Sequence, residues 1–220
     1  RIIIWPETSF EGTIPNEMEL LSVISKRILT DQKAILVVGL LRIDKNKLFN
    51  SLVFLNSKGN IIHQYDKIHL VPFGEYIPLR SKFTKIANFL SLKDFSSGNI
   101  KPNVTLKGLG DILTLICYEI LFTEEVISRL SKNTNLLINI TNDAWFGKTI
   151  GPYQHFALAK IKAVELGIPL ARVANTGISA LISPYGEEIT KIPLYKSGVR
   201  TAKLSLPLKN TIYRKYGKII

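Results

Sequence analysis

Three ionisable side chains in this 220-residue sequence follow predicted strands. Glu7 comes after "RIIIWP", Lys67 after "NIIHQYD", and Cys117, the only cysteine, ends the apolar run "ILTLI". A cysteine thiolate can attack an acyl carbon, a carboxylate can accept the thiol proton, and a lysine ammonium can stabilise the developing oxyanion. Because sheet-based sites gather where strand ends meet loops, the three side chains are candidates for one acyl-transfer site.

Each of the three residues also has a structural interpretation. A lone cysteine at the end of a hydrophobic strand commonly fills a core. A glutamate after Trp-Pro commonly caps a helix or faces solvent, and a lysine in "YDKIHL" commonly lies on the surface. Taken singly, the residues leave open whether Cys117 is a core side chain or a nucleophile.

Alternating strand and helix patterns predict the scaffold that must position these residues. Apolar and β-branched runs predict strands over residues 1–5, 34–41, 50–67 (a hairpin), 111–120, 134–143 and 168–189, then shorter strands to about 204. Helical spacing and end signals predict helices over residues 15–30, near 80–92, 123–132 and 151–167. This order of elements predicts a single α/β domain with a mixed sheet covered by helices.

The net charge of +12, from 29 basic and 17 acidic residues, indicates an anionic neighbour or a lysine-rich solvated surface. The basic, aromatic tail over residues 205–220 alternates lysine and arginine with tyrosine and isoleucine, which suits a membrane interface. No recognised nucleic-acid-binding motif accompanies the charge, so we expect no nucleic-acid partner.

The cysteine and histidine content excludes several other classes. One cysteine excludes an internal disulfide, and with His63, His69 and His155 it gives no pair at zinc-ligand spacing. We therefore expect neither a metal nor a cofactor. No run in the sequence reaches the roughly 18 apolar residues that span a bilayer.

The segments around the candidate residues are more specific than the residues themselves. "WPETSF", "YDKIHLVPFGEYIP", "ICYEILF", "TNDAWFG", "GPYQHF" and "ARVANTGISALI" occur in this order. Together they closely resemble the nitrilase (carbon–nitrogen hydrolase) superfamily and, within it, the apolipoprotein N-acyltransferase branch, from Trp5 to about Tyr216. The resemblance implies an αββα sandwich over residues 1–220 and a catalytic triad of Glu7, Lys67 and Cys117.

The resemblance also implies roles for residues beside the triad. Glu75 matches a second glutamate that supports the lysine and the cysteine. Tyr118 and Glu119 match the residues that follow the nucleophile, and the backbone N–H of Tyr118 is a candidate second oxyanion donor. The strand-end loop that lines the substrate pocket is matched by Asn142, Asp143 and Trp145.

The chain departs from the family pattern at its ends. Family members carry transmembrane helices before and after this domain, and the chain also lacks the usual first strand and helix ahead of "RIIIWPE". We therefore expect either a portion of a longer protein, with the tail leading towards a C-terminal membrane helix, or the product of a broken reading frame.

The implied function is transfer of an acyl chain from phospholipid, through a cysteine thioester, to the α-amine of a diacylglyceryl-cysteine apolipoprotein. The implied location is the bacterial inner (cytoplasmic) membrane, with the catalytic domain on its periplasmic side. Apolar residues between 70 and 92 are then candidates for a lipid-facing lid, or are ordinary core. The alternatives are a soluble nitrilase-type amidase that uses water with the same triad, and an inactive remnant of the acyltransferase.

Overall fold

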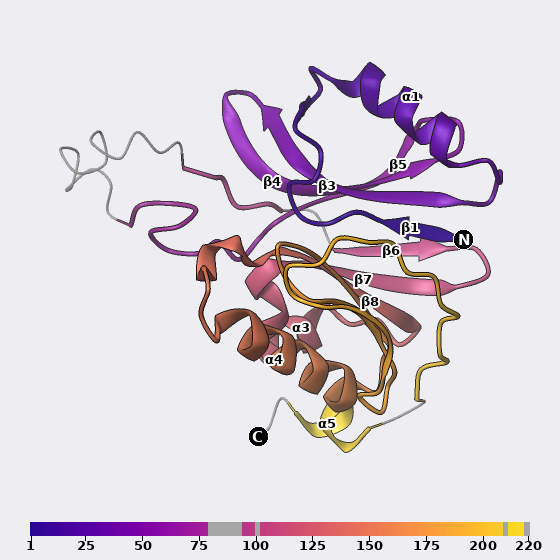
Figure 1. Cartoon of the computed structure of the whole chain (residues 1–220), viewed down its shortest axis with the longest axis vertical. Helices are drawn as coiled ribbons and strands as arrows, with labels where there is room; N and C mark the ends of the chain where they lie inside the picture. The colour runs from indigo at the N-terminus through magenta and orange to yellow at the C-terminus, as the bar shows by residue number, and fades with distance from the viewer. Residues whose placement is uncertain (79–93, 100–101, 209–210, 218–220) are drawn as a thin grey trace. The chain divides into compact units, whose positions relative to one another are not determined.

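The computed structural model of the chain describes residues 1–78, 94–99, 102–208 and 211–217. The chain divides into two compact units, which Figure 1 shows as ribbons. Unit 1 comprises residues 1–3 and 10–100, and unit 2 comprises residues 4–9 and 101–220. The helix expected near 80–92, and with it most of the expected lid, lies outside the described residues.

Unit 1 is built on a five-stranded sheet. Its strands are β1 (Ile2–Ile4), β2 (Thr13–Ile14), β3 (Ile35–Asp44), β4 (Lys47–Asn56) and β5 (Ile61–Asp66). β3 pairs antiparallel with β4 through a two-residue turn, because Lys45 and Asn46 both adopt the positive φ that such a turn requires. β4 then pairs antiparallel with β5, which confirms the hairpin predicted over residues 50–67.

Helix α1 (Met18–Ile28) packs against β4 in unit 1. Its side chain Leu21 is fully buried, and the Ser25 hydroxyl donates to the Asn56 carbonyl at 2.8 Å. The sequence predicted that this helix begins near residue 15, but it begins at Met18. The residues before it form a turn in which the Glu17 carboxylate accepts the Thr13 N–H at 2.6 Å.

Unit 2 is built on a six-stranded mixed sheet. In spatial order its strands are β11 (Glu188–Ile192), β10 (Ser179–Ile182), β9 (Leu170–Asn175), β8 (Thr134–Asn142), β7 (Gly110–Ile116) and β6 (Asn103–Leu106). β7, β8 and β9 are parallel, and the outer pairs are antiparallel. Central parallel strands are buried on both faces, which explains their nearly continuous apolar sequences.

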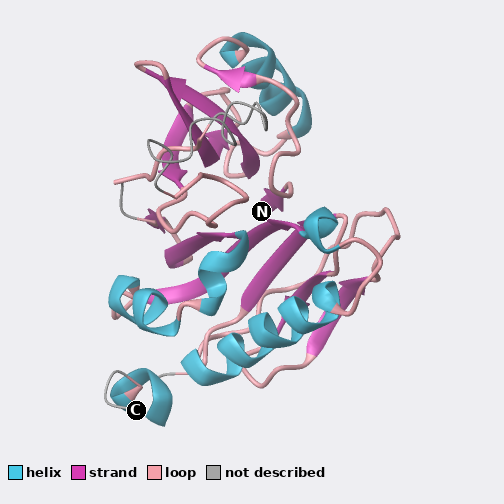
Figure 2. Cartoon of the chain, turned by 90° about the vertical axis from the view of Figure 1, so that its left-hand side faces the viewer, coloured by secondary structure: helices cyan, strands magenta, loops and turns pink. Residues whose placement is uncertain are grey.

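Helices α3 (Thr123–Arg129) and α4 (Gly151–Leu166) cover one face of this sheet (Figure 2). Leu113 and Leu137 from the sheet share one core with Val126 of α3 and Phe156 of α4. Helix α4 ends where predicted, because Gly167 adopts the left-handed conformation that closes a helix. A short helix, α5 (Ile212–Tyr216), lies in the tail. The expected α/β fold with mixed sheets and flanking helices is confirmed.

Two strand predictions for unit 2 are wrong. The strand predicted over 111–120 ends at Ile116, because the chain turns at Cys117 into a short 3-10 helix, η1 (Cys117–Leu121). No strand forms over residues 193–208, although shorter strands were expected to about 204. Among the residues that the structure describes, no helix has both the length and the apolar character needed to cross a membrane.

Candidate active site

Cys117 occupies a strained turn between β7 and η1. Its φ of +54° lies in the left-handed region, which residues other than glycine rarely adopt. The residue is only 6% exposed. Strained backbone of this kind costs about 1–3 kcal/mol and clusters at active sites, where the surrounding structure maintains it. The turn therefore marks Cys117 as more than a core-filling side chain.

Side chains hold this turn from two directions. The buried Glu119 carboxylate accepts the Ile116 N–H at 2.9 Å and faces the Arg129 guanidinium at 3.3 Å. From β8, the Asn139 amide nitrogen donates to the Cys117 carbonyl oxygen at 3.1 Å. These bonds satisfy backbone groups beside Cys117 and fix the direction in which the turn leaves the sheet.

A buried cluster of charged and polar side chains lies behind the turn. The Arg172 guanidinium, fully buried on β9, donates to the Asn139 amide oxygen at 2.6 Å and to the Asp143 carboxylate at 2.9 Å. Asp143, the first residue of η2 (Asp143–Phe146), also lies 2.9 Å from Nδ1 of His155. One connected network thus joins Cys117, through Asn139 and Arg172, to Asp143 and His155.

Burial and pairing set the charges of this cluster. Burial lowers the pKa of Arg172, and the negative charge of Asp143, with those of Cys117 and Glu7 when they are ionised, acts against that effect. Burial would raise the pKa of Asp143, but the His155 hydrogen bond and the Arg172 charge outweigh it, so the pKa is lowered. At neutral pH the carboxylate is therefore ionised opposite the guanidinium.

The His155 ring is the neutral member of the cluster. Burial, together with the Arg172 charge, lowers its pKa more than Asp143 and the Cys117 backbone raise it. The ring stacks on Tyr118, with centroids 5.2 Å apart. Burial, followed by the charges of Cys117 and Asp143, raises the pKa of Tyr118, so the phenol keeps its proton at neutral pH.

The expected pocket residues occupy different environments. Asp143 is buried and its carboxylate is bound by Arg172, whereas Trp145 is 74% exposed. The Asn142 side chain accepts the Ala144 N–H at 3.1 Å and so caps η2. Of the three, Trp145 is the one whose side chain is free to meet a large ligand from solvent.

Glu7 belongs to the same unit as Cys117. Residues 4–9 are part of unit 2, and Glu7 is buried there within the electrostatic reach of Arg172. The two predicted residues that exchange the thiol proton therefore lie in one compact unit.

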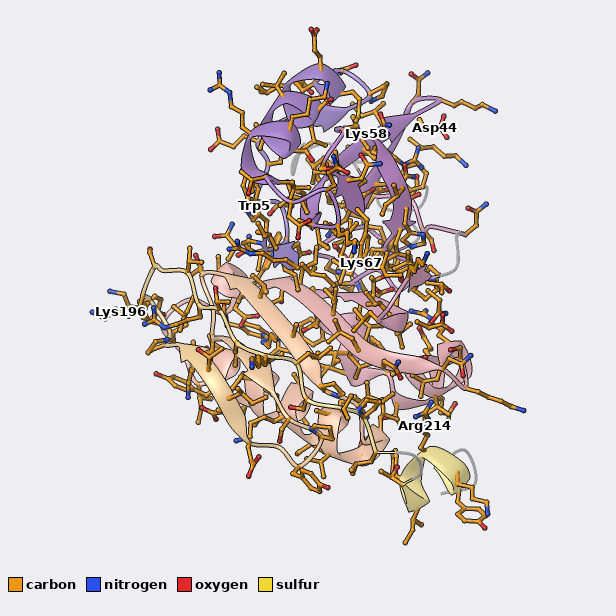
Figure 3. The ribbon with its side chains drawn as sticks, turned by 90° about the vertical axis from the view of Figure 1, so that its right-hand side faces the viewer. Trp5, Asp44, Lys58, Lys67, Lys196 and Arg214 are labelled. Carbon is orange, nitrogen blue, oxygen red and sulfur yellow. The ribbon has the colours of Figure 1, made fainter. Side chains whose placement is uncertain are left out.

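Lys67 and Glu75 form a buried ion pair in unit 1. Lys67, labelled in Figure 3, directly follows β5, and its ammonium lies 2.9 and 2.8 Å from the two Glu75 carboxylate oxygens. The Asn50 amide and the Val71 N–H also donate to that carboxylate, at 3.1 and 2.9 Å. The contact expected between Glu75 and the lysine is present, and it fixes the position of the ammonium group.

Sequence reasoning missed the roles of Asn139, His155 and Arg172. Each is a polar residue within an otherwise apolar segment, "LLINITN", "GPYQHFALA" or "IPLARVAN". Buried polar groups are costly unless they are hydrogen-bonded, so their placement in core segments was the available signal. Among the described side chains, no three of His, Cys, Asp and Glu gather as metal ligands would.

Curated relatives match most of this chain. It is 41% identical over 207 residues to an apolipoprotein N-acyltransferase of Rhizobium etli, covering 90% of this chain and 38% of that protein. It is 35% identical over 229 residues to an apolipoprotein N-acyltransferase of Bradyrhizobium diazoefficiens, covering 99% of this chain and 42% of that protein. The chain thus spans about two fifths of the length of these relatives.

Solved structures share the fold at low sequence identity. An amidase from Nesterenkonia sp. superimposes with a TM-score of 0.61 at 20% identity, covering 88% of this chain and 73% of that one. Nit3 of Saccharomyces cerevisiae, a member of branch 10 of the nitrilase superfamily, gives 0.63 at 18%, with the same coverage of 88% and 73%. The sequence model of the carbon-nitrogen hydrolase family matches residues 2–212, across both units. With this match over nearly its whole length, the chain belongs to the carbon-nitrogen hydrolase family.

Proposed function

We propose that this chain is the catalytic portion of an apolipoprotein N-acyltransferase. The observation that carries the proposal is Cys117, held in a strained strand-end turn within a chain that is 41% identical to an enzyme of that name. The substrates are a phospholipid as acyl donor and a diacylated apolipoprotein as acceptor. The proposed catalytic residues include Lys67, which forms a buried ion pair with Glu75.

In the first step the Glu7 carboxylate takes the proton of the Cys117 thiol. The thiolate attacks the carbonyl carbon of a phospholipid ester, a C–S bond forms, and the ester C–O bond breaks. The lysophospholipid oxygen leaves with the proton held by Glu7. Lys67, kept in place by Glu75, and the Tyr118 backbone N–H stabilise the oxyanion of the tetrahedral intermediate.

In the second step the α-amine of the apolipoprotein attacks the thioester carbonyl. A C–N bond forms, the C–S bond breaks, and Glu7 takes the proton that the amine loses. Cys117 leaves as the thiolate and recovers a proton from Glu7, which restores the starting state. The acceptor leaves as a triacylated lipoprotein.

The proposed reaction takes place at the bacterial inner membrane, on its periplasmic side. The net charge of +12 supports contact with anionic headgroups, and the exposed Trp145 supports contact with an acyl chain or headgroup beside the site. Asn142 and Asp143 shape the loop that presents Trp145.

Replacing the nucleophile tests the proposal. In the full-length protein, Cys117→Ala should abolish an acyl adduct that intact-mass analysis detects on the wild type after incubation with phospholipid. Cys117→Ser should lose most of the activity, because a serine hydroxyl is far less ionised than a thiol at neutral pH. An adduct on the alanine variant contradicts the assignment of Cys117. Release of ammonia from small amides without acyl transfer supports the amidase instead.

A further inference from the structure

We propose that Arg172 is a positioning residue for Cys117, which it serves in two ways. Its guanidinium orients the amide that holds the nucleophile turn, and its buried positive charge favours the thiolate. The inference deepens the proposed function, since it rests on Cys117 being the nucleophile.

The orientation argument begins from strand register. In the parallel pairing of β8 with β9, Asn139 is the register partner of Arg172. Arg172 donates to the amide oxygen of Asn139 at 2.6 Å, and the amide nitrogen donates to the carbonyl oxygens of Cys117 and Leu115, at 3.1 and 3.3 Å. A guanidinium has donors and no acceptors, so it allows only the amide orientation that turns the NH2 group towards Cys117.

The charge argument begins from the cost of burying Arg172. The residue is fully buried, and replacing a buried ion pair by apolar side chains is commonly neutral or stabilising. The Arg172–Asp143 pair therefore has no clear advantage for folding alone. Ionised Cys117 and Glu7 both raise the pKa of Arg172, against the effect of its burial. Because this coupling is reciprocal, the guanidinium favours the ionised form of the thiol.

Asp143, Glu7, His155 and Tyr118 oppose this effect of Arg172 or leave it unchanged, whereas positive charges such as that of Arg129 act in the same direction. Asp143 and Glu7 are negative when ionised and disfavour a thiolate, whereas burial keeps His155 neutral and Tyr118 protonated. The titratable and charged groups of unit 2 that bear on the thiol are Glu7, Tyr118, Glu119, Arg129, Asp143, His155 and Arg172. Under the proposed function, Lys67 joins them from unit 1.

The test is the pH dependence of Cys117 alkylation in the full-length protein. The rate of iodoacetamide labelling of the Cys117 peptide, followed by mass spectrometry, reports the thiolate fraction. For Arg172→Met the midpoint should rise by about one pH unit, which makes labelling below the midpoint about tenfold slower. Arg172→Lys should keep the midpoint close to the wild-type value, because it keeps a buried positive charge that can donate to Asn139. Asp143→Asn should lower the midpoint, since it leaves the guanidinium uncompensated.

The expected midpoint shifts of Arg172→Met and Asp143→Asn have opposite signs, which distinguishes this proposal from a purely structural role of Arg172. Loss of packing alone would move both variants in the same direction, so a rise in the midpoint for Asp143→Asn, or no change in it, overturns the proposal. An unshifted midpoint in folded Arg172→Met overturns it as well. If Arg172→Met does not fold, Asp143→Asn decides the matter alone. Arg214→Met is the matched control: this half-buried arginine on α5 (Figure 3) donates to the Ser131 carbonyl and should leave the midpoint unchanged.

The labelling experiment is independent of the acyl-transfer reaction. If the midpoints shift as expected but no acyl adduct forms from phospholipid, the proposed function fails and the role of Arg172 stands. If the adduct forms but the midpoints do not shift, the function stands and the role of Arg172 fails.

Discussion

Glu119 illustrates how one buried carboxylate supports the turn at Cys117. Its side chain is fully buried, one oxygen accepts the Ile116 N–H, and the other faces Arg129. The backbone strain at Cys117 persists only because neighbouring bonds of this kind offset it. The Glu119 carboxylate is therefore a structural support of the turn at Cys117.

Glu119→Gln should lower the free energy of unfolding by about 2 kcal/mol, because it removes the buried negative charge that faces Arg129 at 3.3 Å and weakens the bond to the Ile116 N–H, while the Arg129–Glu125 pair remains. Urea denaturation followed by circular dichroism measures the change. Glu124→Gln is the control, since Glu124 is exposed in the first turn of α3 and its loss should cost at most about 0.5 kcal/mol. Equal losses in the two variants would contradict the role given to Glu119.

Residue types and their neighbours predicted the candidate nucleophile and its partners, but not the cluster behind them. Glu7, Lys67 and Cys117 are identifiable because each is an ionisable residue at a strand exit within a distinctive segment. Asn139 and Arg172 meet only through the pairing of β8 with β9, whose residues are about 30 positions apart in sequence. Neither strand alone indicates which residue will lie opposite.

At the scale of elements, the end of β5 positions Lys67. The Lys67 N–H donates to the Asn50 carbonyl at 2.8 Å, and the Gly98 N–H donates to the Lys67 carbonyl at 2.9 Å. A Cβ at Gly98 would lie 2.2 Å from the Asp66 carbonyl oxygen. Only glycine lets this later segment approach the strand end so closely, and the approach holds the backbone of Lys67 on both sides.

Gly98→Ala should destabilise the protein by about 1–3 kcal/mol and lower acyl transfer, because the clash with backbone pushes the segment off Lys67. Thermal unfolding and the acyl-adduct assay measure the two effects. Gly198→Ala should be neutral in both, since the nearest atom to its Cβ is the end of the Arg200 side chain at 3.7 Å. Wild-type stability in Gly98→Ala would show that the two segments separate without cost.

Elements with clear end signals were predictable, and elements that depend on distant partners were not. Helix α4 was predicted at 151–167 and spans Gly151–Leu166, because Pro152 lies in its first turn and Gly167 ends it. The strand predicted to 120 was too long, because the apolar pattern continues into η1, where Ile120 is still buried. The segment 193–208 has a strand-like composition but pairs with no strand, and Val199 and Leu206 are 85% and 86% exposed.

At the scale of the whole molecule, the property that bears on function is the net positive charge of +12. The excess of 12 positive charges is spread over a chain whose tail, α5 and its neighbours, mixes lysine and arginine with tyrosine. Scattered surface charges act together on an anionic surface and are screened by salt. Attraction to anionic lipid is therefore an electrostatic expectation, separate from any apolar insertion.

The chain should bind vesicles that contain anionic phosphatidylglycerol, and the bound fraction should fall steeply between 0.05 and 0.5 M salt, where the Debye length shortens from over ~10 Å to below ~5 Å. Co-sedimentation with vesicles measures the bound fraction, and vesicles of phosphatidylcholine alone serve as the control. Binding that is equal on both lipids and insensitive to salt would show that charge does not drive the association.

The pairing of Asn139 with Arg172 also constrains where this chain can change in length. Strand side chains alternate between faces, so one residue inserted within β9 ahead of Arg172 would turn the guanidinium away from its amide. The connection from Gly167 to β9 would not absorb an inserted residue either, because it is buried and its backbone is bonded: the Ile168 N–H donates to the Ala163 carbonyl and the Pro169 carbonyl accepts the Leu137 N–H. An inserted residue is thus expected to disturb the site both within β9 and in the buried connection before it, although these positions are remote in sequence from the cysteine.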